Sequence, residues 1–99
     1  MKKEIIVNDT KYELIKNYRD AFNKEEFISK CTDYFYDYDY IVGDIAYNKL
    51  RLKGFYESAN KKANKINNYK NLDKYLHDYC AVDCKYFIIK KKKGDVNEV

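Results

Sequence analysis

Apolar and polar positions alternate along residues 4–7 and 12–17, a period typical of strands in a half-buried sheet. The Asn-Asp-Thr segment between the two runs has the composition of a turn, so together they predict a β-hairpin. Residues 24–35 then carry apolar side chains every three or four positions, the period of an amphipathic helix. Asn23 precedes this stretch and Glu26 stands three residues later, which predicts an N-cap with a capping-box partner.

Both periods return in the second half of the chain. Residues 40–42 form a short apolar stretch typical of a strand, and residues 49–55 alternate between apolar and basic side chains. A connection over 44–48 is expected to join them. Asn71 is expected to cap a second helix, and residues 85–89 predict a last strand. The apolar stripe of that helix is Leu72, Tyr75, Leu76, Tyr79 and Cys80.

This order of elements predicts an α+β fold. We expect a single-layer, mainly antiparallel sheet of four to five strands with two helices on one face. Without its first strand the order is β-α-β-β-α-β, so a ferredoxin-like layout, β-(β-α-β-β-α-β), is a candidate topology. Residues 1–93 are expected to form a single domain with a mobile Lys/Asn-rich loop at 57–70, and residues 94–99 a polar tail.

Composition removes several classes of function. The chain has 99 residues with only one His, two Ser and three Gly, too few for a Ser-His-Asp site or a glycine-rich phosphate loop. No apolar run approaches the roughly 18 residues of a membrane span, and the N-terminus does not have the composition of a signal peptide. We therefore expect a cytoplasmic protein that is not an enzyme, has no cofactor and does not contact a membrane.

Charge is distributed unevenly along the chain. Residues 1–48 hold 7 basic and 10 acidic side chains, a net charge of −3, whereas residues 49–99 hold 13 and 6, a net charge of +7. Such an asymmetry favours a polyanionic partner, either a nucleic acid or an acidic protein surface. Solvated lysines with no partner are the alternative.

Two-residue alternation gives the 49–55 strand a basic face. Leu50 and Leu52 are expected to face the core, so the basic residues between them and Phe55 face outward. A row of cations beside an exposed ring suits single-stranded RNA, because the cations neutralise phosphates and the ring stacks on a base. Arg51 is the strongest candidate, since a guanidinium can bind a phosphate in two places.

Residues 53–55, Lys-Gly-Phe, also match the opening of the RNA-binding sheet motif of RRM domains, but Tyr56 and Glu57 depart from that motif. The alternative is a solvated strand face on which loop 57–70 partly covers Phe55. Lysines of the loop would extend the basic surface. The candidate contact residues are Lys49, Arg51, Lys53, Phe55, Tyr56, Lys61, Lys62 and Lys65.

Cysteine and histidine supply the soft metal ligands of the chain. The candidates are Cys31, His77, Cys80 and Cys84. Their spacing lacks the second pair of a structural zinc site, so buried thiols are the simpler interpretation, and a regulated thiol pair at positions 80 and 84 is a third. The odd number of cysteines argues against a disulfide-stapled secreted module and for a reducing compartment.

Four aspartates, Asp33, Asp37, Asp39 and Asp44, lie among tyrosines. Asp37 and Asp39 are expected to point to solvent beside a half-buried strand. Asp44 follows a glycine, and its carboxylate is expected to cap backbone donors where the chain turns. No other part of a hydrolase or nuclease accompanies them, so we predict no catalytic residue.

Several segments taken together resemble the YutD-like family of small cytoplasmic proteins from low-GC Gram-positive bacteria. They are Tyr38–Asp44, Leu50–Phe55, Tyr75-Leu76, Tyr79-Cys80, Cys84, Tyr86-Phe87 and Lys90-Lys91. The resemblance runs from about residue 4 to 92. The family pattern keeps the cysteines at positions 80 and 84 but does not require a histidine at position 77. The family has no established activity, cofactor or catalytic residue, so the resemblance implies a fold and a compartment but no mechanism.

The function that the sequence favours is a non-enzymatic cytoplasmic binding module. In the first hypothesis the basic strand contacts RNA or an RNA-containing assembly, with Arg51 and Lys53 on phosphates, Lys49 assisting and Phe55 stacking on a base. In the second hypothesis the same face binds an acidic protein surface as an adaptor, through strand addition to an open sheet edge. Sequence leaves the oligomeric state open.

Overall fold

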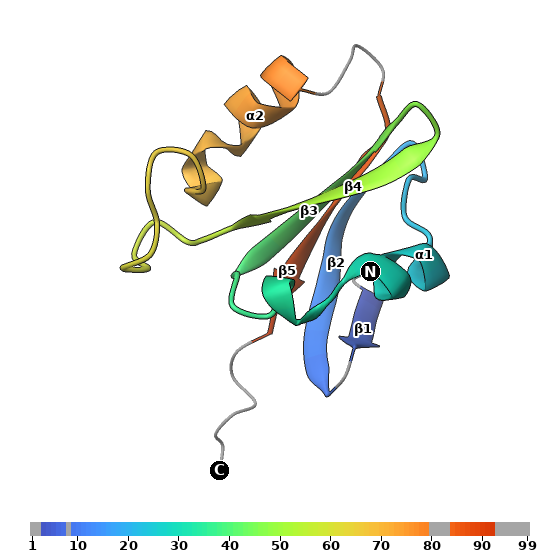
Figure 1. Cartoon of the computed structure of the whole chain (residues 1–99), viewed down its shortest axis with the longest axis horizontal. Helices are drawn as coiled ribbons and strands as arrows, with labels where there is room; N and C mark the ends of the chain where they lie inside the picture. Colours follow the sequence, from blue (N-terminus) through green and yellow to red (C-terminus); the bar gives the residue numbers. More distant parts are fainter. Residues whose placement is uncertain (1–2, 8, 80–83, 93–99) are drawn as a thin grey trace.

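The computed structural model describes residues 3–7, 9–79 and 84–92. Five strands form one antiparallel sheet, with a helix on either side of it (Figure 1). The elements in chain order are β1 (Lys3–Val7), β2 (Thr10–Tyr18), α1 (Lys24–Lys30), the 3₁₀ turn η1 (Asp33–Phe35), β3 (Tyr40–Ala46), β4 (Lys49–Phe55), the 3₁₀ turn η2 (Tyr69–Asn71), α2 (Leu72–Tyr79) and β5 (Tyr86–Lys91). The α+β fold and the antiparallel sheet predicted from sequence are confirmed.

Strand order in the sheet is β1-β2-β5-β3-β4, and every neighbouring pair is antiparallel. Strand β5, the last in sequence of the described strands, therefore lies in the middle of the sheet, between β2 and β3. The candidate ferredoxin-like layout is wrong for this chain. That layout would place both helices on one face of the sheet, whereas here they lie on opposite faces.

The two helices cover opposite faces of the sheet, which corrects the prediction that they share one. Along β3, Ile41 packs in the same cluster as Phe27 of α1, whereas the next residue, Val42, packs with Leu72 of α2. Successive strand residues point to opposite faces, so the clusters lie on the two sides of the sheet. Their fully buried residues include Tyr12, Phe27, Ile41, Phe87 and Ile89 on the α1 side, and Val42 and Phe55 on the α2 side.

The sequence pattern predicted the beginning of α1 correctly but not its end. The Asn23 side chain accepts a hydrogen bond of 2.9 Å from the Glu26 backbone N–H, as the capping pattern predicted. The helix ends at Lys30, and a short 3₁₀ turn replaces the remainder of the predicted 24–35 helix.

A two-residue turn joins β3 to β4, and the predicted connection over 44–48 is wrong. Strand β3 continues to Ala46, which pairs with Lys49. Tyr47 and Asn48 have φ of 53° and 62°, the left-handed backbone that matches the twist of such a hairpin. Asp44 consequently lies inside the strand, and the turn-capping role expected for it is also wrong.

Gly43 leaves room for a core ring. A Cβ atom at this position would overlap the ring of Phe87, which pairs with it across the strands and is fully buried. We expect Gly43→Ala to lower the free energy of unfolding by about 2 kcal/mol, because the ring must leave its place in a close-packed cluster. Urea denaturation measures the change.

Phe87→Leu supplies the control for this prediction. Adding Gly43→Ala to Phe87→Leu should cost less than adding it to the natural chain, since the smaller side chain makes room. Equal costs in the two backgrounds would contradict the assigned overlap.

Candidate functional site

Phe55 and Tyr56 cannot be the exposed rings that the RNA hypothesis placed on β4. Phe55 is fully buried and Tyr56 is 7% exposed. Phe55 does point to the same face as Arg51 and Lys53, as predicted, but α2 covers that face with Tyr75, whose ring meets Phe55 edge-on at 5.5 Å between centroids. The face of β4 that was predicted to point outward is therefore part of a second core near the C-terminal end of the strand.

Arg51 forms an ion pair with a buried carboxylate. Its Nε donates to Oδ1 of Asp44 at 2.8 Å, and the two residues are cross-strand partners. The Asp44 side chain is 2% exposed and that of Arg51 is 47% exposed. The hydrogen bond to Asp44 raises the pKa of the guanidinium. Arg51 is therefore engaged in the folded protein, and its first role is to neutralise Asp44.

The lysines of the predicted site separate into two groups. Lys62 donates to Oδ2 of Asp37 at 2.6 Å, and the Tyr56 hydroxyl donates to the same oxygen at 2.7 Å. Both hydrogen bonds lower the pKa of the Asp37 carboxyl, and the bond from Lys62 has the larger effect. The remaining lysines form no ion pair within the described residues; they are Lys49, Lys53, Lys61 and Lys65.

Asp39 is buried and holds the segment after β4. It is 3% exposed, so the prediction that it points to solvent is wrong. Its Oδ2 accepts hydrogen bonds from the Glu57 backbone N–H at 2.8 Å and from the Asn60 side-chain amide at 3.1 Å. A carboxylate that accepts such bonds is a stable buried anchor.

Asparagine side chains build the 57–70 loop, which was predicted to be mobile. The side-chain Oδ1 of Asn64 accepts hydrogen bonds from two backbone N–H groups. The side-chain Oδ1 of Asn67 accepts from the Asn64 N–H, and Asn68 caps η2. Asn71, predicted to cap α2, instead donates its side-chain amide to the Lys65 carbonyl at 3.1 Å. Short polar side chains of this kind replace the missing secondary structure with local hydrogen bonds.

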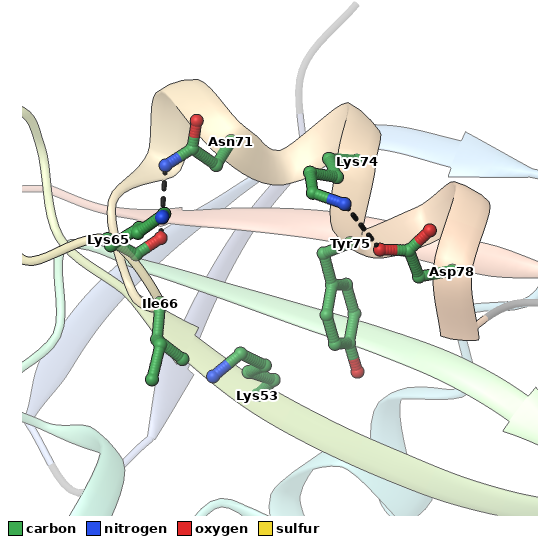
Figure 2. A pocket seen from close by; sticks show the side chains of 7 residues that line it. All are labelled: Lys53, Lys65, Ile66, Asn71, Lys74, Tyr75 and Asp78. Atoms are coloured by element: carbon green, nitrogen blue, oxygen red, sulfur yellow. Dashed lines mark hydrogen bonds and ion pairs between the residues drawn. The ribbon is translucent and has the colours of Figure 1, made fainter.

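The loop, α2 and β4 enclose a cleft of about 510 Å³ (Figure 2). We name it the α2 cleft; its lining residues are Lys53, Lys65, Ile66, Asn71, Lys74, Tyr75 and Asp78. Ile66 and the ring of Tyr75 supply apolar surface, and Ile66 is 75% exposed. Lys74 bonds to Asp78 within the helix at 2.9 Å. Besides Lys74, two further lysines, Lys53 and Lys65, thus lie beside apolar side chains.

A second hollow, of about 340 Å³, follows the edge of β4, and we name it the edge groove. Four consecutive strand residues, 51–54, line it, together with Tyr34, Phe35, Tyr38 and Tyr75. Because consecutive residues point to opposite faces, such a hollow runs along the strand edge and reaches both faces. Lys53 and Tyr75 line both hollows, which therefore adjoin.

Those predicted metal ligands that the structure describes do not form a metal site. Cys31 is buried in the cluster on the α1 face, whereas the His77 side chain is 88% exposed on α2. Cys84 is disulfide-bonded, so the interpretation as a buried free thiol is wrong for this residue. Cys80, the other member of the thiol pair considered above, lies outside the described residues. Within the described residues no group of three or more His, Cys, Asp or Glu could hold a metal ion, and no helix there is long and apolar enough to cross a membrane.

Sequence reasoning missed much of the α2 cleft. Ile66 and Asp78 carried no visible signal, and Tyr75 was identified only as part of a helix stripe. The pairing of Asp44 with Arg51 did have a signal. A two-residue turn at Tyr47-Asn48 fixes the register of the hairpin, and that register places these two residues opposite each other.

Comparison with known proteins gives a consistent result. A family model described as "Putative antitoxin YutD-like" matches residues 6–90, a stretch that runs from β1 into β5. The chain is 41% identical over 87 residues to the Bacillus subtilis (strain 168) protein named "Putative antitoxin YutD", which covers 88% of this chain and 96% of that protein. Its fold resembles the solution NMR structure of protein yutD from B. subtilis, with a TM-score of 0.78 and 40% identity over 92% of this chain and 83% of the other.

We expect Arg51 to contribute to the stability of the fold through its ion pair with Asp44. We expect Arg51→Met to lower the free energy of unfolding by about 2 kcal/mol, since it leaves the Asp44 carboxylate buried without its cation; the partial exposure of Arg51 keeps the loss below that of a fully buried pair. Chemical denaturation measures it. Lys49→Met, on the same strand, is the control, and an equal loss in both variants would argue against the pair.

Asp39 should control the order of the following loop. In Asp39→Ala we expect the backbone amides of Glu57 and Tyr69 to exchange with solvent about tenfold faster, because the loop loses its buried anchor. Amides of the β2–β5 ladder should keep their rates. The exposed Asp33→Ala is the matched control, and unchanged exchange in the loop would contradict this role of Asp39.

Proposed function

Because the chain belongs to the YutD-like family, we propose that it acts as an antitoxin: a non-enzymatic module that holds a toxic partner protein by direct contact. The family description and the name of the B. subtilis relative both contain the word antitoxin. Binding is the simplest way in which a small domain without a visible catalytic constellation can neutralise another protein.

The observation that carries the proposal is the joint surface of the α2 cleft and the edge groove. It combines three tyrosine rings, the ring of Phe35 and the side chain of Ile66 with Lys53 and Lys65. These two lysines have no ion-pair partner within the described residues. Aromatic side chains in a recess, bordered by polar groups, are typical of protein interfaces. The lysines favour a partner that presents carboxylates.

RNA is the second candidate, and the structure removes part of its support. The basic side chains Lys49, Lys53, Lys61 and Lys65 would still attract phosphates. The ring proposed for base stacking is buried, and the guanidinium proposed for phosphate binding is already paired. We therefore favour binding of a protein partner over binding of RNA.

Depletion in the native host tests this function. Loss of the chain should stop growth, and suppressor mutations that restore growth should fall repeatedly in the gene of one protein, its toxic partner. A chain carrying Lys53→Glu and Lys65→Glu should rescue growth poorly, because the reversed charges repel an acidic partner. With the purified partner, calorimetry should show binding weakened by about tenfold or more.

Lys24→Glu with Lys30→Glu is the matched control, since both lysines are exposed on α1, across the sheet from the cleft. This control should rescue growth fully. Normal growth after depletion, or equal failure of both double variants, would contradict the proposal. Micromolar binding of a short single-stranded RNA in fluorescence anisotropy, lost in Lys53→Glu/Lys65→Glu alone, would favour the RNA function instead.

A further inference from the structure

Strand β4 lies at the end of the sheet, with β3 on one side and no strand among the described residues on the other. The two-residue turn makes Ala46 and Lys49 a hydrogen-bonded pair, so odd-numbered residues of β4 direct their backbone groups toward β3. The bond from the Asp39 N–H to the Phe55 carbonyl follows the same alternation. Leu50 and Leu52 therefore direct N–H and C=O away from the sheet, and within the described residues these groups form no hydrogen bond.

The chain itself already uses this edge farther along. The Tyr56 N–H donates to the Asn67 carbonyl, and the Tyr56 carbonyl accepts from the Tyr69 N–H, each at 2.8 Å. Tyr56 and Asn68 thereby form a parallel bridge on the side of the strand opposite β3. An extended segment on this edge is thus compatible with the surrounding side chains. Between the occupied end and the free one, the ring of Tyr38 packs on the face of the sheet over Gly54.

The edge groove lies along the free end. It offers the rings of Tyr34 and Tyr38 on one face of the sheet, and Lys53 beside Tyr75 on the other. An added strand would present alternate side chains to these two faces. One set would meet aromatic rings and the other an ammonium group.

Charge selects the occupant of the groove. A second copy of β4 would bring lysines against lysines, which opposes self-pairing. Lys49 and Lys53 lie on one face of the strand, and Lys65 borders the adjoining cleft. A segment with carboxylates at every second position complements this arrangement.

We propose that the edge of β4 at Leu50 and Leu52 binds an extended segment of the partner protein by strand addition, with acidic side chains facing Lys49 and Lys53 and apolar ones facing Tyr34 and Tyr38. This inference rests on the proposed function, because it describes how the partner is held. Backbone hydrogen bonds supply the affinity, and the two-faced pattern supplies the selectivity.

A synthetic peptide tests the mode of binding independently of any partner. The probe is an acetylated, amidated heptapeptide of alternating glutamate and valine, titrated at low ionic strength and followed by amide shifts of the protein. We expect shifts along β4, and slower hydrogen exchange at Leu50 and Leu52 but unchanged exchange at Arg51 and Lys53, which already bond to β3. A peptide with lysine in place of glutamate should not bind.

Two N-methylated versions of the probe provide the sharpest comparison. Methylation of either the glutamate or the valine nitrogens keeps every side chain, but only one of the two sets faces β4 in an added strand. One version should therefore bind about tenfold more weakly and the other like the parent. Equal affinities for the two versions, unchanged exchange at Leu50 and Leu52, or absence of binding would each overturn strand addition. The depletion experiment would still test the antitoxin function.

Discussion

Burial of both faces of the sheet is the constraint on which the rest of the structure depends. A chain of this size must make each strand serve two cores, so neighbouring residues such as Ile41 and Val42 pack on opposite sides. Buried polar residues in the central strands or directly before them then need partners inside the fold. Asp44 finds Arg51, and Asp39 finds the backbone of the following loop. The long 57–70 segment and α2 are held where they can cover the second face.

The elements were largely predictable because their signals are local. The Asn23 cap and the period of β4 involve residues a few positions apart, and both are found in the structure. The placement of the helices was not predictable from these signals. The α2 face of β4 carries Lys49, Arg51 and Lys53, a pattern that looks solvent-facing, and its cover comes from Tyr75, twenty residues beyond Phe55. Strand alternation separates two faces of a strand; it does not say which of them another element will cover.

The candidate site shows the same division between local and distant information. Lysines could be identified from composition and charge, but their availability depends on long-range partners. Lys62 bonds to Asp37, twenty-five residues away, whereas Lys53 and Lys65 stay beside the α2 cleft. The surface that results combines cations, rings and a strand edge, and it is better matched to an acidic polypeptide than to stacked bases.

The central position of β5 has a consequence for synthesis. Strands β1–β2 and β3–β4 are hairpins of nearby residues, so each can form soon after it leaves the ribosome. Neither can join the other until residues 86–91, which form β5 between them, have also emerged. A chain interrupted before that point consists of two hairpins whose inner edges are unpaired, a state prone to proteolysis and aggregation. The complete sheet can therefore form only after β5 has been synthesised.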